Sequence, residues 1–301
     1  MNFDLESIRE EIVGRDLLIA TPFGDRHLLY ADYTASGRGL RFIEDMLLNI
    51  QKSYANTHTE DDYTGKFTTR LLHTAEEKIK RMVNAGPDGK IIPIGSGTTG
   101  ALKKLQEIIG VSIPPVTRER WSEGIHGAAQ NPSDVFAELQ RRKPVVFIGP
   151  YEHHTNELMW REAFVEVEVV GFNSRGLLDL ADLEEKISAP GRELREKIVS
   201  ISAGSNITGI RTPVYDVARI GHAHGALVFF DFAAVAPYVE IDMNRASDAY
   251  FDAVFFSPHK FLGGPGASGI LIFNQRIYRT DLPPTTAGSY TSSASARTLA
   301  H

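Results

Sequence analysis

Residues 225–274 read GALVFFDFAAVAPYVEIDMNRASDAYFDAVFFSPHKFLGGPGASGILIFN. Three short runs within this stretch, LVFF, AVFF and ILIF, are rich in β-branched and aromatic residues and predict buried strands. Similar runs occur before it, namely KPVVFIGP (143–150), FVEVEVVGF (164–172) and EKIVSIS (196–202). Patterns typical of helices lie between several of the runs, at 154–164, 179–187 and 214–225. This alternation predicts an α/β fold with a mostly parallel sheet that helices cover on both faces.

The sequence before residue 143 predicts further elements. Residues 1–25 predict a short amphipathic helix and a connector through Pro22, and LLYADYTASG (28–37) predicts a strand that ends in a turn-rich loop. Helical patterns follow at 40–55, 66–85 and 101–110, and the apolar run IIPIG (91–95) precedes the last of them. The segment 111–130, which contains Pro114 and Pro115, predicts an irregular excursion on the surface.

These elements divide the chain into three parts. We expect an N-terminal helix and connector at 1–25, a large α/β domain at 26–284, and a tail at 285–301. The tail, TTAGSYTSSASARTLAH, has only Tyr290 and Leu299 as bulky apolar residues and cannot bury enough surface to form a packed element. It predicts either disorder or the ragged end of a truncated chain.

The composition is that of an ordinary globular protein. Of 301 residues, 42% are hydrophobic and 23% are charged, which excludes disordered, collagen-like and disulfide-stapled classes. No apolar run approaches the roughly 18 residues of a membrane span, and the charged N-terminus is no signal peptide, so we expect a cytoplasmic protein with no membrane partner. The net charge of −6 argues against nucleic acid as a partner. The absence of cysteine excludes cysteine-based zinc sites, redox pairs and a thiol nucleophile of the chain's own.

Residues 95–100, GSGTTG, follow an apolar run and precede a helical pattern. They match the G-x-G-x-x-G motif of dinucleotide-binding folds, which also needs an acidic strand end about 20 residues later. The acid nearest that distance, Glu119, lies in TRERWSEG, which predicts no strand end, so a nicotinamide oxidoreductase is not favoured. Backbone N–H groups at a helix start, with the hydroxyls of Thr98 and Thr99, suit a phosphate. A plain strand-to-helix turn with a threonine cap is an equally open alternative.

Lys260 and Asp231 each follow a predicted strand, at the edge where parallel sheets bind ligands. Lys260 lies in SPHKFLGGPG (257–266), with Ser257 and His259 as nearby donors. A desolvated lysine with a lowered pKa suits Schiff-base chemistry with an aldehyde cofactor; the alternative is a surface lysine in a glycine-rich loop. Asp231 precedes the apolar FAAVAPY, where a carboxylate needs a cationic partner such as a protonated pyridine nitrogen. The alternative for Asp231 is a cap on the next segment.

Histidines occur at two further places of interest. In EHHTN (152–156), the imidazole of His153 is placed to lie against a planar ring, and Thr155 or Asn156 is expected to cap the next helix. A histidine satisfied within its own loop is the alternative. His222 and His224 fall at a predicted helix end without carboxylates at ligand spacing, so we expect no metal site.

Several motifs follow one another in chain order: YADYTASG (30–37), SGTTGA (96–101), EHHTN (152–156), SNITGIRTP (205–213), and FFDFAAV (229–235) followed by SPHKFLGGPGASG (257–269). Together they resemble the class V aminotransferase family of pyridoxal-phosphate enzymes, close to the cysteine desulfurases and selenocysteine lyases. The resemblance implies a fold-type I large domain, a homodimer, pyridoxal 5′-phosphate as cofactor and a small-molecule substrate that is an amino acid.

The resemblance also implies a role for each site residue. Lys260 resembles the lysine that bonds to the cofactor aldehyde and then moves protons at the substrate α-carbon. Asp231 is similar to the aspartate that keeps the pyridine nitrogen protonated, and His153 to the ring-stacking histidine. Asn206 resembles the asparagine near the phenolic oxygen of the cofactor. The positions similar to phosphate contacts are Gly97, Thr98, Thr99, Ser257 and His259.

The chain departs from the family pattern at several positions. Gly100 stands where the family often has Glu, and Ala234 stands where a Gln commonly contacts the phenolic oxygen. A desulfurase also needs a thiolate to take up sulfur, and this chain has no cysteine. The likeness fades after about residue 286. We therefore expect a truncated chain without the small C-terminal domain, which carries that thiol and a carboxylate-binding arginine in the family.

These features together predict a pyridoxal-phosphate enzyme that acts on an amino acid and is most similar to the lyase group. Transamination and epimerisation stay open as outcomes. The alternative is a cofactor-binding protein without turnover, because its substrate-binding domain is missing. The carboxylate-binding arginine separates the two, and Arg297 is the only arginine of the tail.

Overall fold

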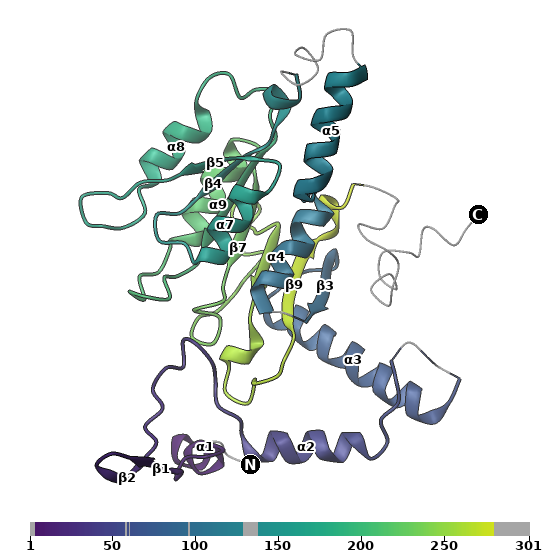
Figure 1. Ribbon diagram of the computed structural model, residues 1–301, viewed down its shortest axis with the longest axis vertical. Coiled ribbons are helices and arrows are strands. Elements are labelled where there is room, and N and C mark those ends of the chain that lie inside the picture. Colours follow the sequence, from purple (N-terminus) through teal and green to yellow (C-terminus); the bar gives the residue numbers. More distant parts are fainter. Residues whose placement is uncertain (1–3, 58, 60, 96, 129–137, 280–301) are drawn as a thin grey trace.

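The computed structural model describes residues 4–57, 59, 61–95, 97–128 and 138–279 (Figure 1). Its main sheet has seven strands among these residues: β3 (Gly89–Ile94), β4 (Val145–Ile148), β5 (Glu166–Val169), β6 (Lys197–Ser202), β7 (Leu227–Asp231), β8 (Ala253–Phe256) and β9 (Gly269–Asn274). Their order across the sheet is β3-β9-β8-β7-β6-β4-β5. Neighbouring strands from β5 to β8 pair in parallel, whereas β9 pairs antiparallel with both β8 and β3. The predicted α/β fold with a mostly parallel sheet is confirmed.

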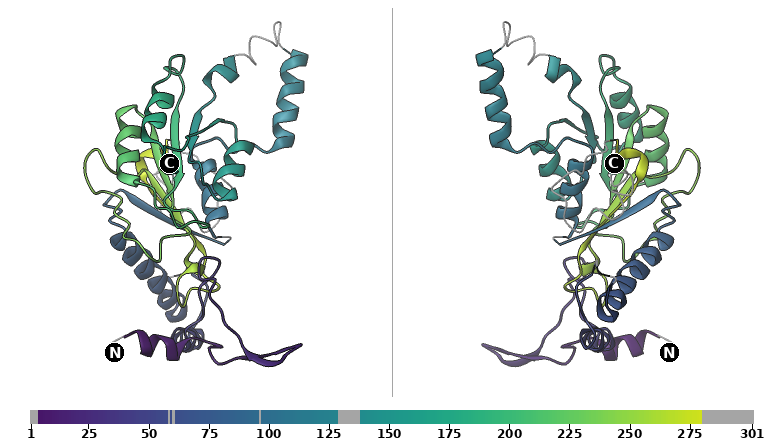
Figure 2. Two further views of the ribbon diagram at one scale, coloured as in Figure 1. Left: turned by 90° about the vertical axis from the view of Figure 1, so that its left-hand side faces the viewer. Right: turned by 90° about the vertical axis from the view of Figure 1, so that its right-hand side faces the viewer.

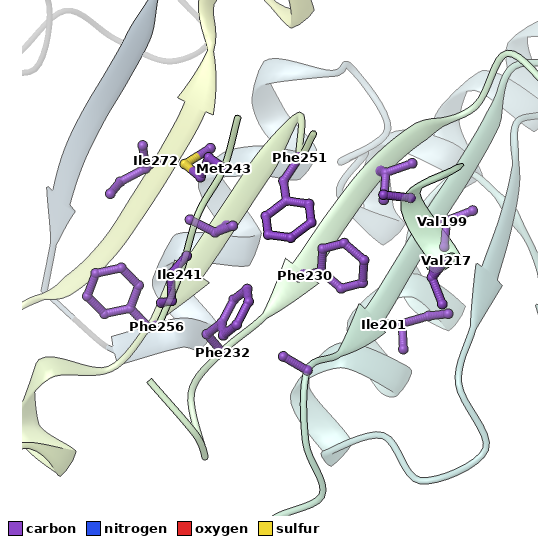
Figure 3. Packing of buried hydrophobic residues seen from close by; sticks show 14 of the residues in the cluster. Val199, Ile201, Val217, Phe230, Phe232, Ile241, Met243, Phe251, Phe256 and Ile272 are labelled. Carbon is purple, nitrogen blue, oxygen red and sulfur yellow. The ribbon is translucent and has the colours of Figure 1, made fainter. Parts of the chain in front are cut away.

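Helices cover both faces of this sheet, as Figure 2 shows. On one face lie α8 (Leu180–Ser188) and α9 (Val214–Ala223), and on the other lie α4 (Gly97–Ile108) and α7 (His154–Glu162). The strands alternate between two buried clusters. In β7, Val228 and Phe230 pack with the α8/α9 cluster, part of which appears in Figure 3, whereas Phe229 packs with the α4/α7 cluster. Because side chains alternate along a strand, Asp231 projects on the same face as Phe229, toward α4 and α7.

The N-terminal elements lie at one end of the sheet in Figure 1. They are α1 (Leu5–Glu11), the antiparallel hairpin of β1 (Leu18–Thr21) and β2 (Gly24–His27), α2 (Arg41–Gln51) and α3 (Tyr63–Met82). The helices expected near the N-terminus, at 40–55 and at 66–85 are present. The hairpin turns at Pro22, so residue 25 falls within β2.

The strand expected in residues 28–37 is wrong. The backbone there makes a turn instead, in which the N–H groups of Ala35 and Ser36 donate to the carbonyl of Asp32. The N–H of Gly37 then donates to the carbonyl of His259. These bonds occupy the backbone groups that a neighbouring strand would have needed.

The irregular segment expected at 111–130 is also wrong, because α5 (Pro115–Ala128) is a helix. Pro115 is its first residue, a position where the missing N–H of proline costs no hydrogen bond. The N–H groups of Thr117 and Arg118 donate to the carbonyl of Pro114. The proline pair therefore starts a helix here and does not break one.

Two further points concern the limits of the described chain. The tail predicted at 285–301 lies outside the described residues, and the domain boundaries stay predictions. Among the helices that the structure describes, none is both long and apolar enough to cross a membrane. Two short 3-10 turns, η1 (Pro258–Lys260) and η2 (Gln275–Ile277), flank β9.

Candidate active site

Polar side chains end three neighbouring strands on the face covered by α4 and α7. Ser202 ends β6 and Asp231 ends β7, and the two residues are paired in register. Asp231 is paired in turn with Phe255 of β8. Ser257 lies two residues beyond Phe255 and so projects on the same face. A row of polar groups therefore runs along the carboxyl edge of the sheet, where α/β folds bind ligands.

Asp231 is a buried carboxyl group in this row, with 3% of its surface exposed. One of its oxygens accepts a hydrogen bond from the N–H of Ala233 at 2.8 Å, and no other donor to this carboxylate is found within the described part of the chain. Burial raises the pKa of Asp231 to about 7, assisted by the negative charge of Glu152 and opposed by the Ala233 hydrogen bond and by Lys260. The group thus has an oxygen free for a cationic partner.

Lys260 ends the η1 turn that follows β8, and its N–H donates to the carbonyl of Ser257 at 3.0 Å. The side chain is half-buried. Burial lowers the pKa of Lys260, while Asp231 and Asp32 act in the opposite direction. A lysine with a lowered pKa has more of the unprotonated amine, which is the nucleophilic form.

The turn that carries Lys260 rests on the N-terminal part of the chain. The N–H of Gly37 donates to the carbonyl of His259 at 2.8 Å, and the N–H of Gly263 donates to the carbonyl of Arg38 at 2.7 Å. A Cβ at Gly37 would lie 1.8 Å from the carbonyl oxygen of Phe261. Only glycine permits this approach. The same N-terminal segment carries Asp32, and the negative charge of Asp32 acts on Lys260.

The start of α4 packs directly against the residues before Lys260. The N–H of Thr98 donates to Ser257 Oγ at 3.0 Å, and the hydroxyls of these two residues are also bonded. Gly97 has φ of 58°, and a Cβ there would lie 3.1 Å from Ser257 Oγ and 3.2 Å from His259 Cε1. Thr99 Oγ1 lies 3.1 Å from Thr155 Oγ1. The predicted phosphate positions are therefore together at a helix N-terminus, an arrangement that suits an anion.

His153 lies at the start of α7 with its ring exposed. Its Nδ1 accepts a hydrogen bond from the N–H of Thr155 at 3.2 Å, so His153 itself is the N-cap. The expectation that Thr155 or Asn156 caps this helix is wrong, because Asn156 is buried within the protein instead. Burial lowers the pKa of His153, and the positive charge of Lys260 lowers it further. The neutral form of the ring is thus favoured, because a proton on it would be repelled by the nearby charge of Lys260.

Burial and Lys260 lower the pKa of His259 in the same way.

Asn206 is the predicted site residue that the structure leaves apart. It lies in the loop after β6 with an exposed side chain, and among the described residues no hydrogen bond or ion pair joins that side chain to Lys260 or Asp231.

Two charged residues of the site, Glu152 and Asp32, were not predicted from the sequence. Glu152 Oε1 accepts hydrogen bonds from the N–H groups of Gly149 and Ser202, both at 2.9 Å. Burial raises the pKa of Glu152. Its position in the loop that follows the buried strand β4 is a usable signal, since the other site residues also lie at or just after strand ends. Asp32 follows no strand, and only the folding of the N-terminal segment brings it near Lys260.

The histidines considered for a metal have other contacts. His222 Nε2 lies 3.0 Å from the carbonyl oxygen of Tyr250, and the two rings stack with centroids 3.7 Å apart. His224 lies 3.9 Å from Glu184. The described residues contain no group of three or more side chains suited to hold a metal ion.

The chain is similar to several known proteins. It is 26% identical over 266 residues to a probable cysteine desulfurase of Halalkalibacterium halodurans, covering 87% of this chain and 56% of the relative. It is 26% identical over 293 residues to a cysteine desulfurase of Serratia proteamaculans, covering 96% of this chain and 62% of the relative. The chain thus spans a little over half the length of these relatives.

Among solved structures, the apo cysteine desulfurase of Thermococcus onnurineus NA1 superposes with a TM-score of 0.68 at 20% identity. The superposition covers 92% of this chain and 58% of that structure, and it shows a shared fold. The profile of the family described as Aminotransferase class-V matches residues 123–299, which is more than half of the chain. The chain belongs to the class V aminotransferase family.

Proposed function

We propose that this chain binds pyridoxal 5′-phosphate at the carboxyl edge of its sheet and acts on an amino acid through Lys260. The class V family depends on this cofactor in general. The observation that carries the proposal is that two groups lie at the ends of neighbouring strands. Asp231 is a buried carboxyl with an unused oxygen at the end of β7, and Lys260 has a half-buried side chain in the turn after β8. A cationic ring nitrogen and an aldehyde are the chemical partners that these two groups need.

The remaining side chains suit the other parts of the cofactor. The donors at the start of α4, with Ser257 and His259, would hold the phosphate. The neutral ring of His153 would cover one face of the pyridine ring. Asn206 would approach the phenolic oxygen only if its loop carried the exposed side chain inward.

The chemistry follows from the charge states of these groups. When bound, the cofactor supplies an electron sink for the charge that develops at the substrate α-carbon. Lys260, with its lowered pKa, is suited to take a proton from that carbon and return it. Asp231 in its ionised form would keep the ring nitrogen protonated. Bond cleavage at the β-carbon, as in a lyase, is the leading outcome because the relatives are cysteine desulfurases; transamination and epimerisation use the same first proton transfer.

Desulfuration has one further requirement. A thiol must take up the sulfur atom, and these 301 residues contain no cysteine. Sulfur transfer therefore needs a thiol from outside these 301 residues. We also propose a cytoplasmic homodimer, as the family resemblance implies; light scattering of the cofactor-loaded protein and cell fractionation test these two points.

The test is the visible absorbance spectrum of the full chain mixed with pyridoxal phosphate. We expect a band that borohydride bleaches in the parent and that Lys260→Ala lacks. Lys78→Ala is the matched control, because Lys78 is an exposed lysine of α3, and it should keep the band. A parent without the band, or an unchanged band in Lys260→Ala, would refute the proposal. Product formation from amino acids added to the loaded protein then separates turnover from cofactor binding alone, since a changed band by itself shows only that an amino acid has bound.

A further inference from the structure

The proposed function gives no role to Glu152, although this residue joins two strands of the site. Its Oε1 is bound by the N–H groups of Gly149, which follows β4, and of Ser202, which ends β6. Its Oε2 accepts from Ser202 Oγ at 2.5 Å and from Asn156 Nδ2 at 2.7 Å. One side chain therefore ties together the carboxyl ends of two neighbouring strands.

The hydrogen bonds around Asn156 fix the direction of the contact with Glu152. Trp160 Nε1 donates to Asn156 Oδ1 at 3.1 Å, and an indole nitrogen is only ever a donor. The amide oxygen of Asn156 must therefore face Trp160, and its NH2 group must face Glu152. Three N–H groups thus converge on the Glu152 carboxyl, and they stabilise its ionised form against the burial that raises its pKa.

Asp231 lies beside Glu152 across a single residue. Ser202, which Glu152 binds through both its N–H and its hydroxyl, is paired in register with Asp231. Paired residues of adjacent strands project on the same face, at the strand spacing of about 4.8 Å. Ser202 therefore lies between the two carboxyl groups and adjoins both, and two carboxyls that interact ionise together only at a cost.

The other charges around this pair are few. Lys260 is the described cation that acts on Asp231. Lys260 itself is influenced by Asp32 and acts on the rings of His153 and His259. Both rings have lowered pKa values, so Lys260 is the cation among the described residues that acts on this pair, through Asp231.

We propose that Glu152 is a positioning residue that acts on Asp231 across Ser202, so that the two carboxyl groups behave as one coupled pair. Burial and the negative charge of Glu152 together favour a proton on Asp231 until a cation lies against it. A proton and a cationic ring nitrogen then compete for the same oxygen. The inference rests on the proposed function only for the identity of that cation; the coupling itself belongs to the chain alone.

The test is a titration of the full chain without added cofactor, with ¹³C labels in the aspartate and glutamate carboxyl carbons. In Glu152→Gln, the midpoint of Asp231 should move to lower pH by on the order of one pH unit, because a neighbouring negative charge is gone. Coupling is reciprocal, so Asp231→Asn should move the midpoint of Glu152 in the same direction. Glu157→Gln is the matched control: Glu157 lies on α7 and pairs with Arg161, and its loss should leave Asp231 unchanged.

An Asp231 midpoint that is the same in parent and Glu152→Gln overturns the proposal. If Glu152→Gln fails to fold, the Asp231→Asn arm decides, and an unchanged Glu152 midpoint there overturns it equally. A purely structural Glu152 would alter stability in these variants but would leave the midpoints in place. Because no cofactor is present, a chain that never forms the lysine-dependent band can still show the coupling, and the two proposals fail independently.

Discussion

Replacing Asp231 by Asn should change how the stability of the cofactor-free chain depends on pH. Burial raises the pKa of this carboxyl from its ordinary 3.8 to about 7. Between these values the folded chain holds a proton that the unfolded chain has lost. Its contribution to stability is therefore complete below the lower value and disappears as pH rises through the higher one.

The magnitude follows from the interval. Between pH 3.8 and about pH 7, the free energy of unfolding of the parent falls by up to about 1.4 kcal/mol for each pH unit, or roughly 4 kcal/mol in all. Asn cannot ionise, and its side-chain oxygen can still accept the hydrogen bond from Ala233. The free energy of unfolding of Asp231→Asn should therefore rise, relative to that of the parent, by roughly 2 to 3 kcal/mol as the pH increases from about 5 to about 8.

Urea unfolding of both proteins at several pH values measures this difference directly. The remaining ionisable groups are common to both chains, so the effects of those that do not interact with Asp231 cancel in the comparison. Asp45→Asn is the control, because Asp45 is an exposed residue of α2, and it measures the effect of removing a carboxyl group outside the site. If the Asp231→Asn difference is constant with pH, the folded chain carries an ionised Asp231 throughout, and the reasoning from burial is refuted.

Three other changes test the site. Gly97→Ala should cost about 1 to 2 kcal/mol of unfolding free energy because Gly97 has a positive φ, and it should also weaken cofactor binding. Gly176→Ala is the control and should show only the backbone cost, since Gly176 has φ of 71° and open space around it. Equal cofactor binding in both variants would contradict the crowding at Gly97. Gly37→Ala should lose more stability than Gly176→Ala, by about 1 to 3 kcal/mol, with loss of the lysine-dependent band; an intact band would show that the turn tolerates the Cβ. The His153 ring should titrate below 6.5 by NMR and move upward in Lys260→Met, because a nearby positive charge is removed; an unmoved midpoint would separate the two groups.

Much of the sheet was predictable because each central strand is a short apolar run between turns. The runs at 145–148, 198–201 and 227–230 are buried on both faces, and burial of that kind leaves a continuous pattern in the sequence. The direction of β9 left no such pattern, since ILIF is equally apolar in either orientation. Helix α5 was missed because its sequence, PVTRERWSEGIHGA, has no clear apolar stripe and begins with a proline.

The candidate site was partly predictable for a similar reason. Lys260, Asp231 and His153 each follow a strand, so the fold rule that places ligands at strand ends applies to them. Glu152 also follows a strand, but its importance depends on Ser202 and Asn156, whose contacts arise only when β4, β6 and α7 pack together. The contact of Gly37 with the turn of Lys260 joins segments more than two hundred residues apart. No local pattern encodes such a contact.

The antiparallel strand β9 has a consequence for the newly made chain. β3 stands at the sheet edge with β9 as its neighbour, and β9 is the last strand of the sheet to be synthesised. While the ribosome makes everything between residues 95 and 268, the apolar segment GKIIPI has no partner to pair with. An unpaired strand of this kind is a template for aggregation, and Pro93 within it reduces the backbone donors that it offers. Pairing between segments so far apart in the chain forms slowly. The time at which β9 is synthesised therefore decides how long β3 stays unpaired.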